Sequence, residues 1–98
     1  MKVFLDDRRE APEGWIRCYW PHEVISLLIT GDVTEISLDH DLGDDERGTG
    51  YDVISWIECW VITNGFIPPK IHIHTDNPAA RQRMEAGVAS IARWLEER

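Results

Sequence analysis

Short apolar runs alternate along the chain with amphipathic stretches, and this pattern predicts strands that alternate with helices. Strands are predicted over four segments: Val3–Leu5, Trp15–Trp20, Glu35–Asp39 and Lys70–Thr75. Helices are predicted over three: Pro21 to Thr30, Tyr51–Thr63, and a last helix that begins at Asn77-Pro78. Strands that alternate with helices are typical of a parallel sheet with helices packed on it.

The length and apolar content predict one domain over residues 1–98. The chain has 98 residues and is 43% hydrophobic, which suits a single core. No apolar run approaches the roughly 20 residues needed to cross a bilayer. Carboxylates follow the first apolar run at once, which is unlike a signal peptide. We therefore expect a cytoplasmic protein whose two cysteines, Cys18 and Cys59, are reduced and packed.

The charge of the chain limits the ligands it can bind. Eighteen Asp and Glu against ten Lys and Arg give a net charge of -8. Because Lys and Arg supply most non-specific affinity for nucleic acids, a broad basic phosphate-binding surface is excluded. If the protein handles a phosphate, a metal ion or a few placed cations must offset the local negative field.

Three of the predicted strands end in polar groups that can do chemistry. These groups are Asp6-Asp7-Arg8, Asp39-His40-Asp41 and His74-Thr75-Asp76-Asn77. The carboxyl ends of parallel strands meet at one edge of the sheet, where ligands bind. Carboxylate oxygens suit Mg²⁺ or Mn²⁺, so Asp6, Asp7 and Asp39 are the predicted metal ligands. The alternative is that these acids only cap helices and solvate loop ends.

Histidines and an arginine accompany these carboxylates. His74, at a strand end, and His40 are candidate acids or bases, because the pKa of histidine lies near neutrality. Arg8 offers a guanidinium fork to a phosphate, and a salt bridge to its acidic neighbours is the alternative. Substrate contacts are expected from Arg8, His72, Thr75 and Asn77. A purely structural role is the alternative for each histidine, above all for His72 inside its strand.

Five tryptophans are more than a small core needs. Trp15 and Trp20 flank the second predicted strand and could stack on a nucleobase. Trp56 and Trp60 stand four residues apart, so they share one helix face. Packing in the core or in a homodimer is the alternative for all of them, and a homodimer is therefore an expectation.

These residues resemble the pattern of response-regulator receiver domains. On that resemblance Asp6 and Asp7 match the metal-binding acids, Asp39 the phosphate-accepting aspartate, and Thr75 the hydroxyl residue of the family. The resemblance implies a reduced flavodoxin-like, three-layer α/β fold, with a four-stranded parallel sheet in the order 2-1-3-4 and about three helices. The chain departs from the family in two ways. It has no helix between the first two strands, and no fifth strand to carry the family's lysine.

A smaller family fits the sequence more closely. The segments Asp6-Asp7-Arg8, Ser37-Leu38-Asp39-His40-Asp41-Leu42-Gly43 and Ile71-His72-Ile73-His74 resemble the cyclic-phosphate-processing receiver-like domains. This resemblance spans essentially the whole chain. It implies a metal-dependent phosphoesterase that hydrolyses a cyclic phosphate, either the 2′,3′-cyclic end of an RNA, as in RNA repair, or a cyclic nucleotide.

Two other functions remain open from the sequence. One is a phosphoacceptor, or a module that binds a cyclic nucleotide without cleaving it. The other is a small interaction protein whose acids hold a structural ion. Asp39 could hold a metal ion or attack the phosphate itself.

Overall fold

The computed structural model describes residues 1–97. This part of the chain contains four strands: β1 (Lys2–Leu5), β2 (Trp15–Cys18), β3 (Glu35–Leu38) and β4 (Lys70–Ile73). It also contains the helices α1 (Pro21–Ile29), α2 (Gly50–Asn64) and α3 (Pro78–Glu96), and a short 3-10 helix, η1 (Asp45–Arg47), in the loop after β3. The predicted order of strands and helices is confirmed, and η1 was not predicted.

Three strands end earlier than the hydrophobic pattern predicts. β3 ends at Leu38 rather than Asp39, and β4 ends at Ile73 rather than Thr75. The backbone N–H groups of Asp39 and His74 each donate one more hydrogen bond, to Leu5 and Leu38, at 3.0 Å. Beyond these bonds the backbone leaves the ladder, so the polar side chains stand just past the end of the sheet. β2 likewise ends at Cys18, two residues before Trp20.

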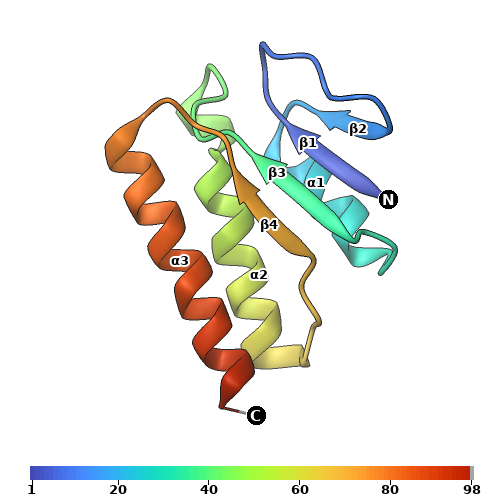
Figure 1. Cartoon of the computed structure of the whole chain (residues 1–98), viewed down its shortest axis with the longest axis vertical. Coiled ribbons are helices and arrows are strands. Elements are labelled where there is room, and N and C mark those ends of the chain that lie inside the picture. The colour runs from blue at the N-terminus through green and yellow to red at the C-terminus, as the bar shows by residue number, and fades with distance from the viewer. Residues whose placement is uncertain (98) are drawn as a thin grey trace.

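The four strands are parallel and lie in the order β2-β1-β3-β4 (Figure 1). Leu5 of β1 is in register with Cys18 of β2 and Leu38 of β3, and Leu38 is in register with Ile73 of β4. The residues that follow these positions therefore meet at one edge of the sheet. The predicted α/β receiver-like fold, with its strand order and three helices, is confirmed within residues 1–97.

The number of layers differs from the expected three. One face of the sheet shares a single core with residues of all three helices. The strand residues in this core include Val3, Leu5, Ile36 and Leu38. Right-handed crossovers explain this for α1 and α2, because both connect strands that step in the same direction across the sheet. Helix α3 follows the last strand and packs on α2 and β4. The connection from β1 to β2 steps in the opposite direction and would cover the other face. It is a loop without a helix, so the described chain forms two layers.

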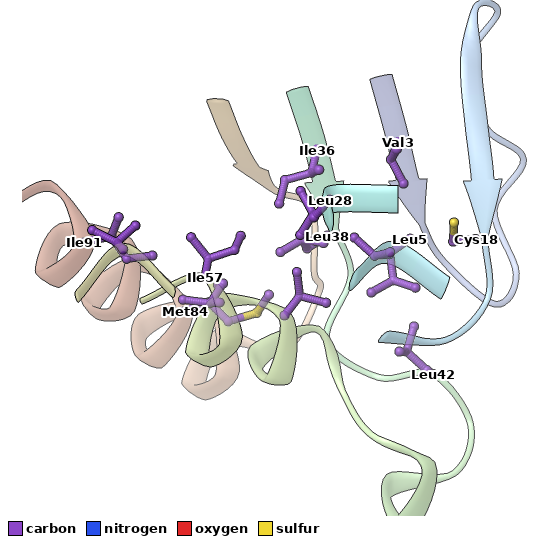
Figure 2. Close-up of a cluster of buried hydrophobic side chains, with 14 residues drawn as sticks. Val3, Leu5, Cys18, Leu28, Ile36, Leu38, Leu42, Ile57, Met84 and Ile91 are labelled. Carbon is purple, nitrogen blue, oxygen red and sulfur yellow. The ribbon is translucent and has the colours of Figure 1, made fainter. Parts of the chain in front are cut away.

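The core lies between the sheet and the helices, as Figure 2 shows for Leu5, Leu38 and Leu28. Helix α3 packs closely on α2 at Gly87, where a Cβ atom would lie 2.7 Å from Cγ2 of Ile54. Met84 of this helix is completely buried. The Asn77 side chain caps the start of α3, where its Oδ1 accepts the backbone N–H of Ala80 at 3.1 Å.

The tryptophans mostly pack rather than lie open. Trp56 and Trp60 stack on each other with ring centroids 4.6 Å apart, and both contact Phe66 edge-on. Arg47 of η1 lies 3.9 Å from the ring centroid of Trp20. Trp94 is 42% exposed. Among the described residues, no helix combines the length and the apolar character that a membrane span requires.

Candidate functional site

Three carboxylates meet at the carboxyl edge of the sheet. Asp6 and Asp7 follow β1, Asp39 follows β3, and one oxygen from each lies within 4.8 Å of the other two. They form part of a cleft of about 280 Å³ lined by Asp6, Asp7, Arg8, Arg9, Asp39, Asp41, Gly43, Thr75 and Asp76. The three acids that the sequence analysis selected as metal ligands are thus brought together by the parallel register of the strands.

Asp6 is the most buried of these three carboxylates. It is 1% exposed, and its Oδ1 accepts the backbone N–H groups of Arg8 and Arg9 at 2.8 and 2.9 Å. Its Oδ2 lies 3.1 Å from Nε2 of His74. Burial alone would raise the pKa of Asp6, but the two backbone hydrogen bonds and His74 together lower it. Asp6 is therefore ionised at neutral pH.

Asp39 has the opposite electrostatic environment. Burial and the negative charge of Asp6 raise the pKa of Asp39, although the backbone N–H of His40, at 2.8 Å, and the hydroxyl of Thr75 stabilise its carboxylate. The first residue of α2 packs directly behind it. A Cβ atom on Gly50 would lie 1.8 Å from the backbone oxygen of Asp39, so only glycine fits there.

The two arginines after the acidic pair play different structural roles. Arg8 is 89% exposed in its side chain, and its contact with a carboxylate is a 3.9 Å approach to Asp7. Arg9 donates from Nη1 to the backbone oxygen of His74 at 2.6 Å and forms an ion pair with Asp76. Arg9 thus ties the end of β1 to the end of β4. Arg8 is therefore the guanidinium that can turn toward a ligand.

His74 lies behind the carboxylates and is not among the residues that line the cleft. Its Nδ1 lies 2.7 Å from Oγ of Ser37, and its Nε2 contacts Asp6. Its ring stacks on Phe4, with centroids 4.4 Å apart and planes 3° from parallel. Burial lowers the pKa of His74, although the charge of Asp6 works against this shift. Both ring nitrogens have partners, an arrangement that favours a positioning role over the predicted acid–base role.

His40 and Asn77 lie beside Asp41, which does line the cleft. Nδ1 of His40 is 2.9 Å from Oδ1 of Asp41, and this hydrogen bond is the main reason that the pKa of Asp41 is lowered. Asn77 caps α3 and reaches Oδ2 of Asp41 at 3.5 Å. His40 thus stands next to the cleft, while Asn77 already uses its amide for structure.

His72 is not brought into the site. It lies inside β4, on the face of the sheet away from the core, and its Nε2 is 3.6 Å from a carboxylate oxygen of Glu35. Its ring also meets Trp15 edge-on, with centroids 6.5 Å apart. The substrate contact expected from His72 has no support in this geometry. Thr75, by contrast, is 3% exposed and lines the cleft.

Several residues of this region were not predicted from the sequence. Arg9, Asp41, Gly43 and Asp76 line the cleft, and Ser37 contacts His74. Arg9, Asp41 and Asp76 each lie beside a selected residue of the strand-end motifs, so their position was the available signal, and Gly43 ends the segment from Ser37 that carries the family resemblance. Ser37 gave no signal beyond its place on the polar face of a strand, because its partner lies 37 residues away.

Comparison with known proteins agrees with this geometry. A family model, described as the cyclic-phosphate processing receiver domain, matches residues 1–90. Searches of curated proteins and of solved structures returned no match. The matched region contains all four strands, the three clustered carboxylates and most of α3. The chain therefore belongs to the family of cyclic-phosphate processing receiver domains.

Proposed function

We propose that the protein is a metal-dependent phosphoesterase that hydrolyses a cyclic phosphate. The observation that carries this proposal is the cluster of Asp6, Asp7 and Asp39, whose oxygens lie within 4.8 Å of one another in a cleft that Arg8 also lines. The family of the chain supplies the chemical class of the substrate. The cleft supplies a place where a phosphate could meet both a cation and a guanidinium.

A divalent ion such as Mg²⁺ or Mn²⁺ fits the donors of this cluster. All three are hard carboxylate oxygens, which these ions prefer. The charge of Asp6 contributes to the raised pKa of Asp39, and a cation between them would relieve that repulsion. When bound, such an ion polarises phosphoryl oxygens and lowers the pKa of water.

The remaining residues have roles that follow from their positions. In hydrolysis, the oxygen of one water forms a bond to phosphorus, and one ring P–O bond breaks. The leaving oxygen takes up a proton, so a 2′,3′-cyclic phosphate becomes a monoester beside a free hydroxyl. Arg8 is free to bind the non-bridging oxygens. His40, held by Asp41 at the edge of the cleft, is the candidate for proton transfer.

We propose two substrate classes, which the same chemistry would serve: the 2′,3′-cyclic end of an RNA and a small cyclic nucleotide. The first would place the protein in RNA repair. A cytoplasmic location is part of this proposal. The free state of Cys18 and Cys59 agrees with the reducing conditions there.

Phosphorus NMR tests the proposal directly. A panel of 2′,3′- and 3′,5′-cyclic nucleotides is incubated with the protein and Mn²⁺ or Mg²⁺, and a sample with chelator serves as the blank. We expect a metal-dependent monoester signal that Asp39→Asn abolishes. Asp32→Asn is the matched control, because Asp32 is exposed and does not line the cleft. Unchanged spectra with every substrate would reject catalysis.

One observation favours a second function, that of a phosphoacceptor or a binding module. The Thr75 hydroxyl is hydrogen-bonded to Asp39, as expected if Asp39 accepted a phosphoryl group. No lysine is among the residues that line the cleft, which weighs against ordinary phosphotransfer. Incubation with a small phosphodonor separates the two functions. A stable mass increase on Asp39 without turnover of cyclic phosphates would favour the phosphoacceptor.

A homodimer stays a prediction. Trp94 and Ile62 are 42% and 47% exposed, and they line one surface pocket. Light scattering over a range of concentrations would detect a dimer, and a constant monomer mass would reject it.

A further inference from the structure

Ser37 is a buried hydroxyl in the middle of β3 that the proposed reaction does not use. It is 8% exposed, and its neighbours Ile36 and Leu38 point into the core on the other face of the sheet. Its Oγ lies 2.7 Å from Nδ1 of His74. A buried hydroxyl destabilises the folded protein unless it is hydrogen-bonded. The contact with His74 provides that hydrogen bond for Ser37.

The hydrogen bonds of His74 determine which of its nitrogens carries the proton. Ionised Asp6 can only accept hydrogen bonds, so Nε2 of His74, 3.1 Å from Oδ2 of Asp6, must donate. In the neutral ring, Nδ1 is then an acceptor. The Ser37 hydroxyl must donate to it, and this donation selects the Nε2–H tautomer. The result is a chain of donors that runs from Ser37 through His74 to Asp6.

This series of hydrogen bonds from Ser37 through His74 completes the hydrogen bonding of Asp6. The Oδ1 atom already accepts two backbone N–H groups, and His74 holds Oδ2. Phe4 stacks flat on the imidazole, so the ring cannot turn without losing that contact. A side chain that is hydrogen-bonded to a metal ligand orients that ligand. Loss of such a side chain typically weakens metal binding about 10–100-fold.

We propose that Ser37 and His74 are positioning residues that orient Asp6 toward the bound cation. This inference rests on the proposed function, because it assigns Asp6 to a metal site. It places His74 outside the set of catalytic residues. It also gives a role to Ser37, which binds neither substrate nor metal.

The first test is the protonation of the ring in the metal-free protein. Two-bond ¹H–¹⁵N NMR distinguishes the two neutral histidine tautomers. We expect His74 to be the Nε2–H tautomer in the wild type and to become a mixture in Ser37→Ala. A wild-type His74 in the Nδ1–H form would overturn the proposal, because Ser37 could not then be the donor.

The second test is the affinity for Mn²⁺, measured by electron paramagnetic resonance of the free ion. We expect Ser37→Ala to lose about 10-fold in affinity, the lower end of the range for loss of a metal ligand's hydrogen-bond partner, because Ser37 acts on Asp6 through His74, and Ser37→Thr, which keeps the hydroxyl, to recover most of it. His72→Gln is the matched control, since His72 is in register with Ser37 on the neighbouring strand β4 and lies on the same face of the sheet, but contacts Glu35. Thermal unfolding with chelator checks that each variant is folded.

The outcomes separate the two proposals. Ser37→Ala with wild-type Mn²⁺ affinity would reject the positioning role and leave the proposed function intact. A wild-type protein that binds no Mn²⁺ or Mg²⁺ would reject the proposed metal site and, with it, the positioning role. Equal losses of Mn²⁺ affinity in Ser37→Ala and His72→Gln would show that any substitution on this face of the sheet weakens metal binding. This result would also overturn the inference.

Discussion

The backbone oxygen of Asp39 lies so close to Gly50 that a Cβ atom on Gly50 would stand 1.8 Å from it. Gly50 also donates its N–H to the backbone oxygen of His40 at 3.1 Å. The start of α2 is therefore pressed against the strand end that carries the central carboxylate. A single side-chain atom at position 50 would have to move either the helix or Asp39.

Gly50→Ala is therefore expected to affect both stability and the site. Overpacking of this kind costs about 1–3 kcal/mol, and the displaced Asp39 should also weaken Mn²⁺ binding. Gly31→Ala is the matched control. Nothing lies within 4 Å of a Cβ there, although its φ of 83° is unfavourable for alanine. Urea unfolding and Mn²⁺ titration should show two defects in Gly50→Ala and a stability defect alone in Gly31→Ala.

Asp39→Asn is expected to stabilise the metal-free protein. The pKa of Asp39 is raised in the folded state, so its ionised form opposes folding at neutral pH. The stability associated with this group is fully present below its unfolded pKa and is lost as pH rises through the folded pKa. Asparagine does not ionise, so the variant avoids this loss of stability. It should also no longer be stabilised by Mn²⁺. Thermal unfolding at pH 7 with chelator measures the difference, and a lower melting temperature than the wild type would contradict the prediction.

Asp6→Asn, unlike Asp39→Asn, is expected to destabilise the metal-free protein. The pKa of Asp6 is lowered in the folded state, so its ionised form contributes stability above its unfolded pKa, and that stability disappears as pH falls through the folded pKa. Hydrogen bonds to a charged group contribute about 1.5–3 kcal/mol each, so we expect a loss of about 2 kcal/mol at pH 7. Urea unfolding of the variant and the wild type should converge in acid. A difference that persists at low pH would contradict this cause.

The two cysteines should differ sharply in reactivity. Burial raises the pKa of Cys18 to about 11. Cys59 is exposed, so the expectation that both thiols are packed is wrong for Cys59. Because the thiolate is the reactive form, iodoacetamide at pH 8 should label Cys59 and spare Cys18 in the native protein. Mass spectrometry of peptides identifies the labelled site, and Cys59→Ser should remain unmodified until urea is added. Rapid labelling of Cys18 in folded protein would show that this thiol is accessible.

The charge of the cleft predicts how salt affects the choice of substrate. Five aspartates and two arginines line it, and the whole chain has a net charge of -8. Long RNA should be repelled at low salt, since exposed charges interact over a Debye length of about 10 Å at 0.1 M. With Mg²⁺ held constant, kcat/KM for an RNA with a cyclic phosphate end should rise with KCl. The value for a cyclic mononucleotide should change little, and a fall with KCl for the RNA would contradict this expectation.

The hydrophobic pattern was sufficient to predict the four strands and three α-helices, though not η1 or the exact strand ends, and with them the parallel arrangement and the meeting of Asp6, Asp7 and Asp39. The reason is that strand alternation and right-handed crossovers are local rules. Once the strands are parallel, whatever follows each of them must lie at one edge. The proximity of the acids that follow β1 and β3 could therefore be predicted without any knowledge of their side-chain orientation.

The tertiary structure alone decided the roles of the residues around these acids. His74 contacts Asp6 across 68 residues of chain and Ser37 across 37, and no sequence period encodes such partners. Past the strand ends, the alternation that orients side chains no longer applies, so the different roles of Arg8 and Arg9 could not be predicted. The second layer of helices was expected from family resemblance. It is absent among the described residues because the β1–β2 connection, which would have formed it, contains no helix.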